Sequence, residues 1–281
     1  MDLSESSELE YLSPLVAELR RSSPGAQWVV VGAMARDLQL YFKHGVRVSR
    51  ATDDVDFAVA TENWGHFQDF RNKLISSGNF SPVGDDKHIF RFTDGTRVDV
   101  IPFGGVENPS GIVEWPPDGN PQMNVLGFSA LMASAEEFLL PAQGRILVAT
   151  IPIILLLKFF AWEDRNKIRP GVDASDIFLI LSNYTGLDDA ESLFATHDDL
   201  LHDPSFDYEN AGAIIAGRDL RQELEQDSVH AREALSRLKN VITAQLEGDE
   251  PGMLLQQAPR GQLERFNELL QGFMRGLSER L

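Results

Sequence analysis

Along the first 150 residues, short apolar runs alternate with stretches of helical period, and beyond them only helical patterns follow. This mixture predicts an α+β fold, with an N-terminal mixed-sheet core flanked by helices (residues 1–150) and a C-terminal helical region (residues 151–281). Strands are expected at Gln27–Gly32, at Asp54–Ala60 and in two hairpins, His88–Phe103 turning at Asp94-Gly95 and Glu137–Thr150 turning at Gln143-Gly144. Helices are expected at 5–22, 33–44, 62–77, 151–165, 173–184, 187–197, 208–246 with a break, and 259–280.

Composition and charge narrow the range of partners. Hydrophobic residues make up 43% of the 281 residues, so the chain can bury a substantial core. The net charge of −18 argues against a broad nucleic-acid-binding surface and against docking on anionic lipid. The absence of cysteine excludes disulfides, thiolate metal sites and a thiol nucleophile. The most apolar run, Ile151–Trp162, contains a lysine and is too short to span a bilayer, and the N-terminus is acidic, so we expect a soluble, cytoplasmic protein without a membrane partner.

Charge is spread unevenly along the chain. Between Pro170 and Gly217 there is no Lys or Arg, while Asp and Glu recur throughout. A solvated acidic helix face is the simpler explanation, and a docking face for a basic partner protein is the alternative.

Three aspartates form the strongest chemical signal. Asp54 and Asp56 are two apart on an expected strand, so both carboxylates point to one face while Val55 points to the other. Asp99 lies between two valines of the next hairpin and joins that face if its strand lies beside the first. Three carboxylates at one place repel one another unless a cation compensates them, and divalent metal ions bridged by a triphosphate do so.

A glycine turn lies upstream of these carboxylates. The apolar run Gln27–Gly32 ends at Gly32, and a helix is expected to start directly after it. A strand, a glycine turn and a helix N-terminus present free backbone N–H groups and a favourable dipole to phosphate. Arg36, one turn into the helix, is a candidate for a further phosphate contact.

Gly32-Ala33, Asp54-Val55-Asp56 and Asp99 together resemble the motif of the polymerase-β-type nucleotidyltransferase superfamily. Within it the chain is most similar to the AbiEii/MenT group of toxin-type nucleotidyltransferases. That likeness rests on an arginine before the aspartate pair and on a lysine, an arginine and an Asp-x-x-Asp segment after it: Arg50, Lys158, Arg165, Asp173 and Asp176. It covers residues 27–184. Ala33 departs from the Gly or Ser of the superfamily motif.

The resemblance implies a metal-dependent transfer of a nucleoside monophosphate from an NTP to a hydroxyl. It makes residues 1–150 the nucleotidyltransferase core and 151–281 a helical domain that completes the nucleotide site and carries an acidic surface. Two Mg²⁺ ions are implied, with Mn²⁺ as a substitute, held by Asp54, Asp56 and Asp99. The implied catalytic residues are these three and Lys158, and the implied nucleotide-binding residues are Gly32, Ala33, Arg36, Arg50, Lys158, Arg165, Asp173 and Asp176.

The implied acceptor is a tRNA 3′ end or a protein, and the implied setting is the toxin of a type IV toxin-antitoxin system with an antitoxin partner. Basic residues that gather near the motifs provide a local path for an RNA end: Lys43, Arg47, Arg50, Arg165, Lys167 and Arg169. An enzyme acting on a small hydroxylated molecule and a catalytically silent nucleotide-binding module are the alternatives.

The downstream residues also have purely structural explanations. Lys158 can be a lysine whose stem lies along an apolar helix while its amine reaches the edge. Asp173 and Asp176 can be first-turn acids that stabilise a helix N-terminus. Trp162 is better explained by core packing than by base stacking.

Overall fold

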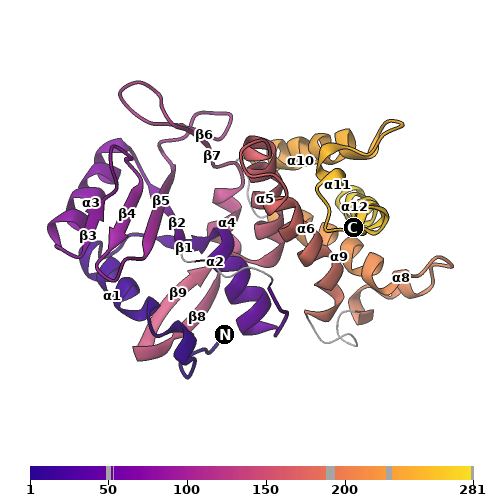
Figure 1. Ribbon diagram of the computed structural model, residues 1–281, viewed down its shortest axis with the longest axis horizontal. Coiled ribbons are helices and arrows are strands. Elements are labelled where there is room, and N and C mark those ends of the chain that lie inside the picture. The colour runs from indigo at the N-terminus through magenta and orange to yellow at the C-terminus, as the bar shows by residue number, and fades with distance from the viewer. Residues whose placement is uncertain (49–51, 53, 188–193, 226–229, 280–281) are drawn as a thin grey trace. The chain divides into compact units, whose positions relative to one another are not determined.

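The computed structural model describes residues 1–48, 52, 54–187, 194–225 and 230–279, and this part of the chain is an α+β protein. It divides into two compact units (Figure 1). Unit 1 comprises Met1–Lys43 and Arg47–Thr150, and unit 2 comprises His44–Val46 and Ile151–Leu281. Unit 1 contains a mixed β-sheet with helices, whereas the described part of unit 2 is helical.

In unit 1, the described strands form a seven-stranded sheet in the order β3-β4-β5-β2-β1-β9-β8 and a two-stranded ribbon, β6-β7. The pairs β2–β5 and β1–β9 are parallel and the others antiparallel, so the sheet is mixed. The strands are β1 (Trp28–Val31), β2 (Asp54–Thr61), β3 (Phe80–Pro82), β4 (Ile89–Phe92), β5 (Arg97–Gly104), β6 (Ile112–Glu114), β7 (Gln122–Asn124), β8 (Glu136–Leu140) and β9 (Gly144–Val148).

Helices lie on both faces of this sheet (Figure 1). The helices are η1 (Ser7–Leu9), α1 (Leu12–Ser22), α2 (Gly32–Asp37), the π-helical η2 (Leu38–Lys43), α3 (Trp64–Ser76), α4 (Phe128–Ser134) and η3 (Pro141–Gln143). Alternation along β2 sends Val55 and Phe57 to the face that α3 covers, where Phe57 packs edge-on against Trp28 at 5.3 Å. The opposite face carries the polar residues of β2, together with Phe103 of β5, whose ring packs against Phe128 of α4.

Both expected hairpins are confirmed, β4–β5 and β8–β9. The second turns through η3 rather than at Gln143-Gly144: Ala142 has a φ of 52°, and Gly144 already begins β9. The helix expected at 5–22 is in fact η1 followed by α1, and the one at 33–44 is α2 continuing as the π-helical η2. Most of the helix expected at 187–197 lies outside the described residues.

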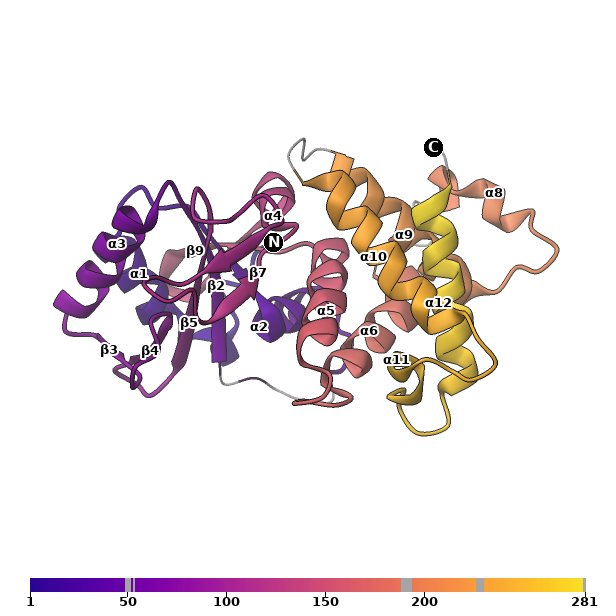
Figure 2. The same cartoon turned by 90° about the horizontal axis from the view of Figure 1, so that it is seen from above.

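In unit 2, helix α9 packs against helix α12 (Figure 2). The side chains buried in this unit are mainly aromatic and aliphatic. Its described helices are α5 (Ile151–Arg165), α6 (Val172–Asn183), η4 (Tyr184–Gly186), α8 (Asp198–Leu201), α9 (Tyr208–Glu225), α10 (Ala231–Leu246), α11 (Met253–Gln256) and α12 (Leu263–Ser278). At the α9–α12 crossing, Gly217 and Gly276 leave no room for a Cβ against the facing backbone. Phe159 of α5 stacks on Phe273 of α12 with ring centroids 5.6 Å apart. Among the described residues, no helix is both long and apolar enough to cross a membrane.

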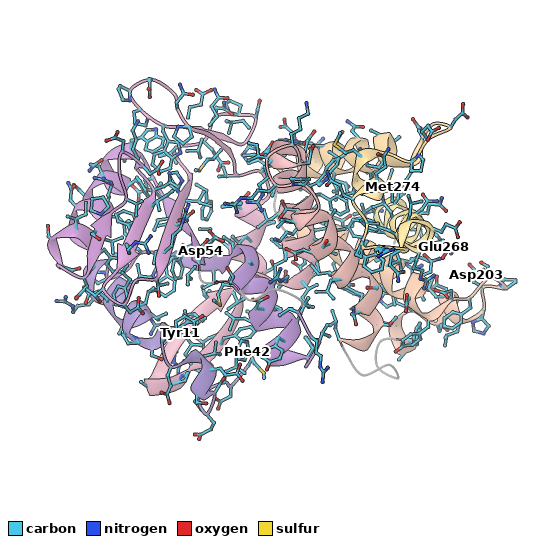
Figure 3. The ribbon with its side chains drawn as sticks, viewed as in Figure 1. Tyr11, Phe42, Asp54, Asp203, Glu268 and Met274 are labelled. Carbon is cyan, nitrogen blue, oxygen red and sulfur yellow. The ribbon has the colours of Figure 1, made fainter. Side chains whose placement is uncertain are left out.

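The acidic stretch after Pro170 is largely balanced by arginines of unit 2 itself. Asp199 pairs with Arg218 of α9, and Asp203, labelled in Figure 3, pairs with Arg275 of α12 at 3.0 Å. Arg265 of α12 bridges Asp207, Glu209 and Glu268. The described carboxylates of this stretch therefore tie helices together as well as facing solvent.

Candidate active site

The three predicted metal-binding aspartates lie on one face of the sheet of unit 1. β2 and β5 are parallel neighbours, with Asp56 directly opposite Asp99 and Asp54 directly opposite Arg97. Because residues opposite each other on paired strands point to the same face, the three carboxylates and the guanidinium share that face. All four side chains are half-buried, and Asp54, labelled in Figure 3, marks the start of β2. The expectation that the second strand lies beside the first is confirmed.

The glycine turn lies directly against this cluster. β1 ends at Val31, which pairs with Asp56, and α2 begins at the next residue, Gly32. Gly32 has a φ of 68°, and a Cβ there would overlap the Oδ2 atom of Asp56. No side chain caps the N-terminus of α2. Glycine is therefore required twice, by the backbone conformation and by the carboxylate that occupies the space beside it.

Gly32→Ala should displace the Asp56 carboxylate and strain the turn. We expect it to lose at least about 1 kcal/mol of unfolding free energy from the left-handed backbone alone, plus the cost of the clash. Gly78→Ala is the matched control in unit 1, because Gly78 has a φ of 76° and open space around it. Equal melting temperatures for the two variants in a thermal scan would contradict the close packing of Asp56 on the turn.

Arg97 is a site residue that the motif analysis missed. Its Nε and Nη2 atoms donate to Oδ1 and Oδ2 of Asp99, each at 2.8 Å. This hydrogen-bonded pair, and the nearby charges of Asp54 and Asp56, raise the pKa of the Arg97 guanidinium further above its ordinary value, against an opposing effect of burial. The sequence does hold a signal, since Arg97 and Asp99 are two apart on an expected strand and so share a face.

The carboxylates of this face have the chemistry to bind a hard divalent cation, but one of them is paired with an arginine. Carboxylate oxygens are the ligands that Mg²⁺ prefers, and Asp54 and Asp56 supply them next to the glycine turn. Both oxygens of Asp99, however, are engaged by Arg97. Among the described residues, no group of three acidic or histidine side chains is arranged to hold a metal ion. Arg97 competes with a metal ion for the Asp99 carboxylate.

Of the two arginines predicted to bind nucleotide upstream of β2 or just before it, Arg36 lies among the described residues and Arg50 does not. The Arg36 side chain is only 2% exposed and donates from Nε to Oδ1 of its neighbour Asp37 at 2.7 Å. The structure thus places Arg36 in a buried ion pair, and its predicted contact with phosphate stays a prediction. Arg50 lies outside the described residues.

Unit 2 brings together the four downstream residues of the resemblance. Lys158 of α5 is buried, and its Nζ lies 2.5 Å from Oδ2 of Asp176 and 3.3 Å from Oδ1 of Asp173, both on α6. Arg165 donates to both oxygens of Asp173, at 2.8 and 2.7 Å. Burial acts to raise the pKa of Asp173, but the hydrogen bonds from Arg165 and the charge of Lys158 outweigh it and hold that pKa below 3.8.

These ion pairs give each of the four residues a structural role between α5 and α6. Their predicted contacts with nucleotide stay a prediction. Trp162, on the same helix, is buried and donates from Nε1 to Oε1 of Gln257 at 2.9 Å, as expected of a packing residue.

A cavity of about 760 Å³ opens in unit 1 at the ends from which β2 and β5 start. Thr52, just before β2, and the Gly95-Thr96 turn before β5 form one part of its wall. The opposite part carries aromatic side chains, of which Tyr11 and Tyr41 are 40% and 39% exposed. Its lining is completed by Glu8, Leu9, Met34, Asp37, Phe42, Arg47 and Val48.

No protein-family model and no curated protein matches the chain. Solved structures are similar to it at low TM-scores, among them the following three. A solution structure of the antibiotic-resistance factor ANT(2'')-Ia is 12% identical, with 69% of this chain and 96% of that chain covered and a TM-score of 0.38. A crystal structure of ANT(2'')-Ia with adenylyl-2''-tobramycin is 14% identical, with 68% and 94% covered and a TM-score of 0.38. An RNA terminal U-transferase is 13% identical, with 99% and 88% covered and a TM-score of 0.28. Because these TM-scores are low, the likeness carries no argument about chemistry, and the interpretation of the site depends on its own residues.

Proposed function

We propose that the protein is a nucleotidyltransferase that transfers a nucleoside monophosphate from an NTP to an acceptor hydroxyl and releases pyrophosphate. The observation that carries the proposal is the face shared by Asp54, Asp56 and Asp99, with Asp56 packed on the Gly32 turn. Three carboxylates at neighbouring positions on one face repel one another, and the single guanidinium of Arg97 offsets only part of that repulsion.

The proposed roles follow from position. Asp54 and Asp56 hold Mg²⁺, which when bound offsets the charge of the triphosphate and polarises the reacting phosphate. The backbone N–H groups at Gly32 and Ala33 face the phosphates. The acceptor oxygen forms a bond to the α-phosphorus while the bond to the bridging oxygen of pyrophosphate breaks, and the role proposed for Asp99 is to accept the hydroxyl proton.

The test is incubation with each α-³²P-labelled NTP, Mg²⁺ and a cell extract. Label in an RNA or protein band with the native protein, and none with an Asp54→Ala/Asp56→Ala variant, is the expected result. No transfer from any NTP, together with no Mg-NTP binding by calorimetry, would overturn the proposal. Tight Mg-NTP binding without pyrophosphate release would instead identify a silent binding module.

The acceptor site is proposed to be the cavity at the starts of β2 and β5. Its volume of about 760 Å³ suits one small molecule or one terminal nucleotide. The exposed rings of Tyr11 and Tyr41 favour a flat acceptor group, and Arg47 in the wall favours one that carries phosphate. Lys43, part of the expected basic path, pairs with Glu136 at 2.6 Å. We infer the end of an RNA, rather than a protein side chain, as the acceptor from the two exposed tyrosines, in a wall that also carries the acidic Glu8 and Asp37. A toxin role and an antitoxin partner rest on the sequence resemblance alone.

Tyr41→Ala should weaken acceptor binding without changing NTP binding. Loss of one stacking ring raises the acceptor KM by about 5- to 150-fold, because base–aromatic stacking contributes about 1–3 kcal/mol. Tyr208→Ala is the control, since Tyr208 is 46% exposed and lies in unit 2. Steady-state kinetics with the labelled acceptor measure both constants, and an unchanged acceptor KM would contradict the assignment. Full activity on a small hydroxylated molecule without salt-sensitive RNA binding would identify the alternative substrate class.

A further inference from the structure

Arg97 is a cationic partner of the aspartate cluster, and it makes the strongest kind of pair that an arginine forms. Two parallel N–H···O bonds of 2.8 Å join its guanidinium to both oxygens of Asp99. The two residues are i and i+2 on β5, so the pair needs no other element to hold it. The Arg97 side chain is 36% exposed, whereas that of Asp99 is 17% exposed.

The strand register places this pair within a larger group of charges. Asp54 lies directly opposite Arg97, and Asp56 lies directly opposite Asp99. Three carboxylates and one guanidinium therefore occupy adjacent positions on two parallel strands. One positive charge among three negative charges relieves part of their repulsion when no metal ion is bound.

The same arrangement opposes metal binding. A guanidinium that engages both oxygens of Asp99 takes one lone pair of each and so competes with a cation for that carboxylate, and its own charge repels the ion. Arginine also binds phosphate through the same planar fork that it uses for a carboxylate. A partly exposed arginine beside a triphosphate site can thus exchange one anionic partner for the other.

We propose that Arg97 is a positioning residue that holds Asp99 in the metal-free protein and releases it to the metal ion when the NTP provides a second anionic partner. This inference rests on the proposed function. It makes the binding of metal and of nucleotide mutually reinforcing, because each favours the arrangement in which Arg97 has left Asp99. Metal alone binds weakly, since it must displace Arg97 without an alternative partner for the guanidinium.

Arg97→Gln tests the inference through metal binding without turnover. Titration of the nucleotide-free protein with Mn²⁺, followed by the EPR signal of the free ion, should show about tenfold or more tighter binding in the variant. The same variant should melt at a lower temperature in metal-free buffer and recover when Mn²⁺ is added, because its carboxylates have lost their compensating charge. Arg97→Lys retains the charge without the fork, so we expect a smaller gain in Mn²⁺ affinity.

Arg91→Gln is the matched control. Arg91 lies opposite Arg97 on the neighbouring strand β4, is exposed, and donates to the backbone oxygen of Gly95. Removing it takes away the same charge without touching the Asp99 pair, so Mn²⁺ affinity should change by less than about threefold in physiological salt.

Three outcomes overturn the inference. Unchanged or weaker Mn²⁺ binding by a folded Arg97→Gln variant, with binding intact in the native protein, rejects the role of Arg97 and leaves the proposed function standing. Equal gains in Mn²⁺ affinity with Arg91→Gln and Arg97→Gln also reject it, because the loss of one positive charge near the site would then explain both. Absence of Mn²⁺ binding in every variant, with and without NTP, removes the proposed function together with the inference.

Discussion

Asp56→Asn is expected to abolish nucleotidyl transfer, lowering kcat by at least about 100-fold, while the protein stays folded. Asp56 is the carboxylate that meets both other parts of the candidate site. It lies opposite Asp99 on β5, and its Oδ2 atom fills the space beside Gly32. Asparagine has nearly the same shape, so the packing at the turn is kept while the negative charge is lost. The variant therefore tests the charge of the Asp56 side chain while its shape is kept.

The melting temperature of Asp56→Asn tests the repulsion among the three carboxylates. Removing one of three neighbouring like charges relieves repulsion, so the melting temperature of Asp56→Asn should equal or exceed that of the native protein in metal-free buffer. Asp69→Asn on the exposed side of α3 is the control and should leave both transfer and melting temperature unchanged. Near-native transfer by Asp56→Asn in the labelled-NTP assay would remove this residue from the metal site.

Much of the unit 1 architecture could be predicted because local signals agree there. Asp94-Gly95 between alternating runs correctly predicts the β4–β5 hairpin, and Asp-Val-Asp correctly predicts which face of β2 is polar. What the sequence alone could not supply is the neighbour of β2. A parallel partner is joined through a long connection, so no local pattern determines that β5 lies beside β2 with Asp99 opposite Asp56.

The arginines show a different limit of sequence analysis. The spacing from Gly32 predicts a phosphate contact for Arg36, which stays a prediction; its side chain is buried and pairs with Asp37. The motif gives no role to Arg97, which lies within the candidate site. Sequence spacing places a residue on a helix turn or a strand face, but which anion a long, flexible side chain reaches depends on tertiary packing.

The buried ion pairs of Lys158 in unit 2 predict a large contribution to stability. Lys158→Met should lower the free energy of unfolding by about 3–5 kcal/mol, because it leaves Asp176 buried without its cation. The side chains of Lys158 and Asp176 are only 6% and 9% exposed, so water cannot compensate the charge. Chemical denaturation monitored by far-UV circular dichroism measures the loss. Lys167→Met is the control, since Lys167 is exposed near the end of α5.

The stability contributed by Asp173 should fall as the pH is lowered. Asp173 has a folded-state pKa below its ordinary value of 3.8, so its contribution to stability is present above that value and is lost as the pH falls through the folded-state pKa. Lys158 is one cause of the low pKa of Asp173. The native protein therefore loses more stability on acidification than Lys158→Met, and the difference between them should narrow below about pH 4.

The double variant Lys158→Met/Asp176→Leu separates a structural lysine from a nucleotide-binding one. Replacing both partners by apolar side chains removes the unpaired buried charge, so most of the lost stability should return. If Lys158 and Asp176 serve only to join α5 and α6, NTP affinity measured by calorimetry returns with the fold. If either residue contacts the nucleotide as the sequence resemblance implies, stability returns while NTP affinity stays low, because both side chains are then missing from the nucleotide site.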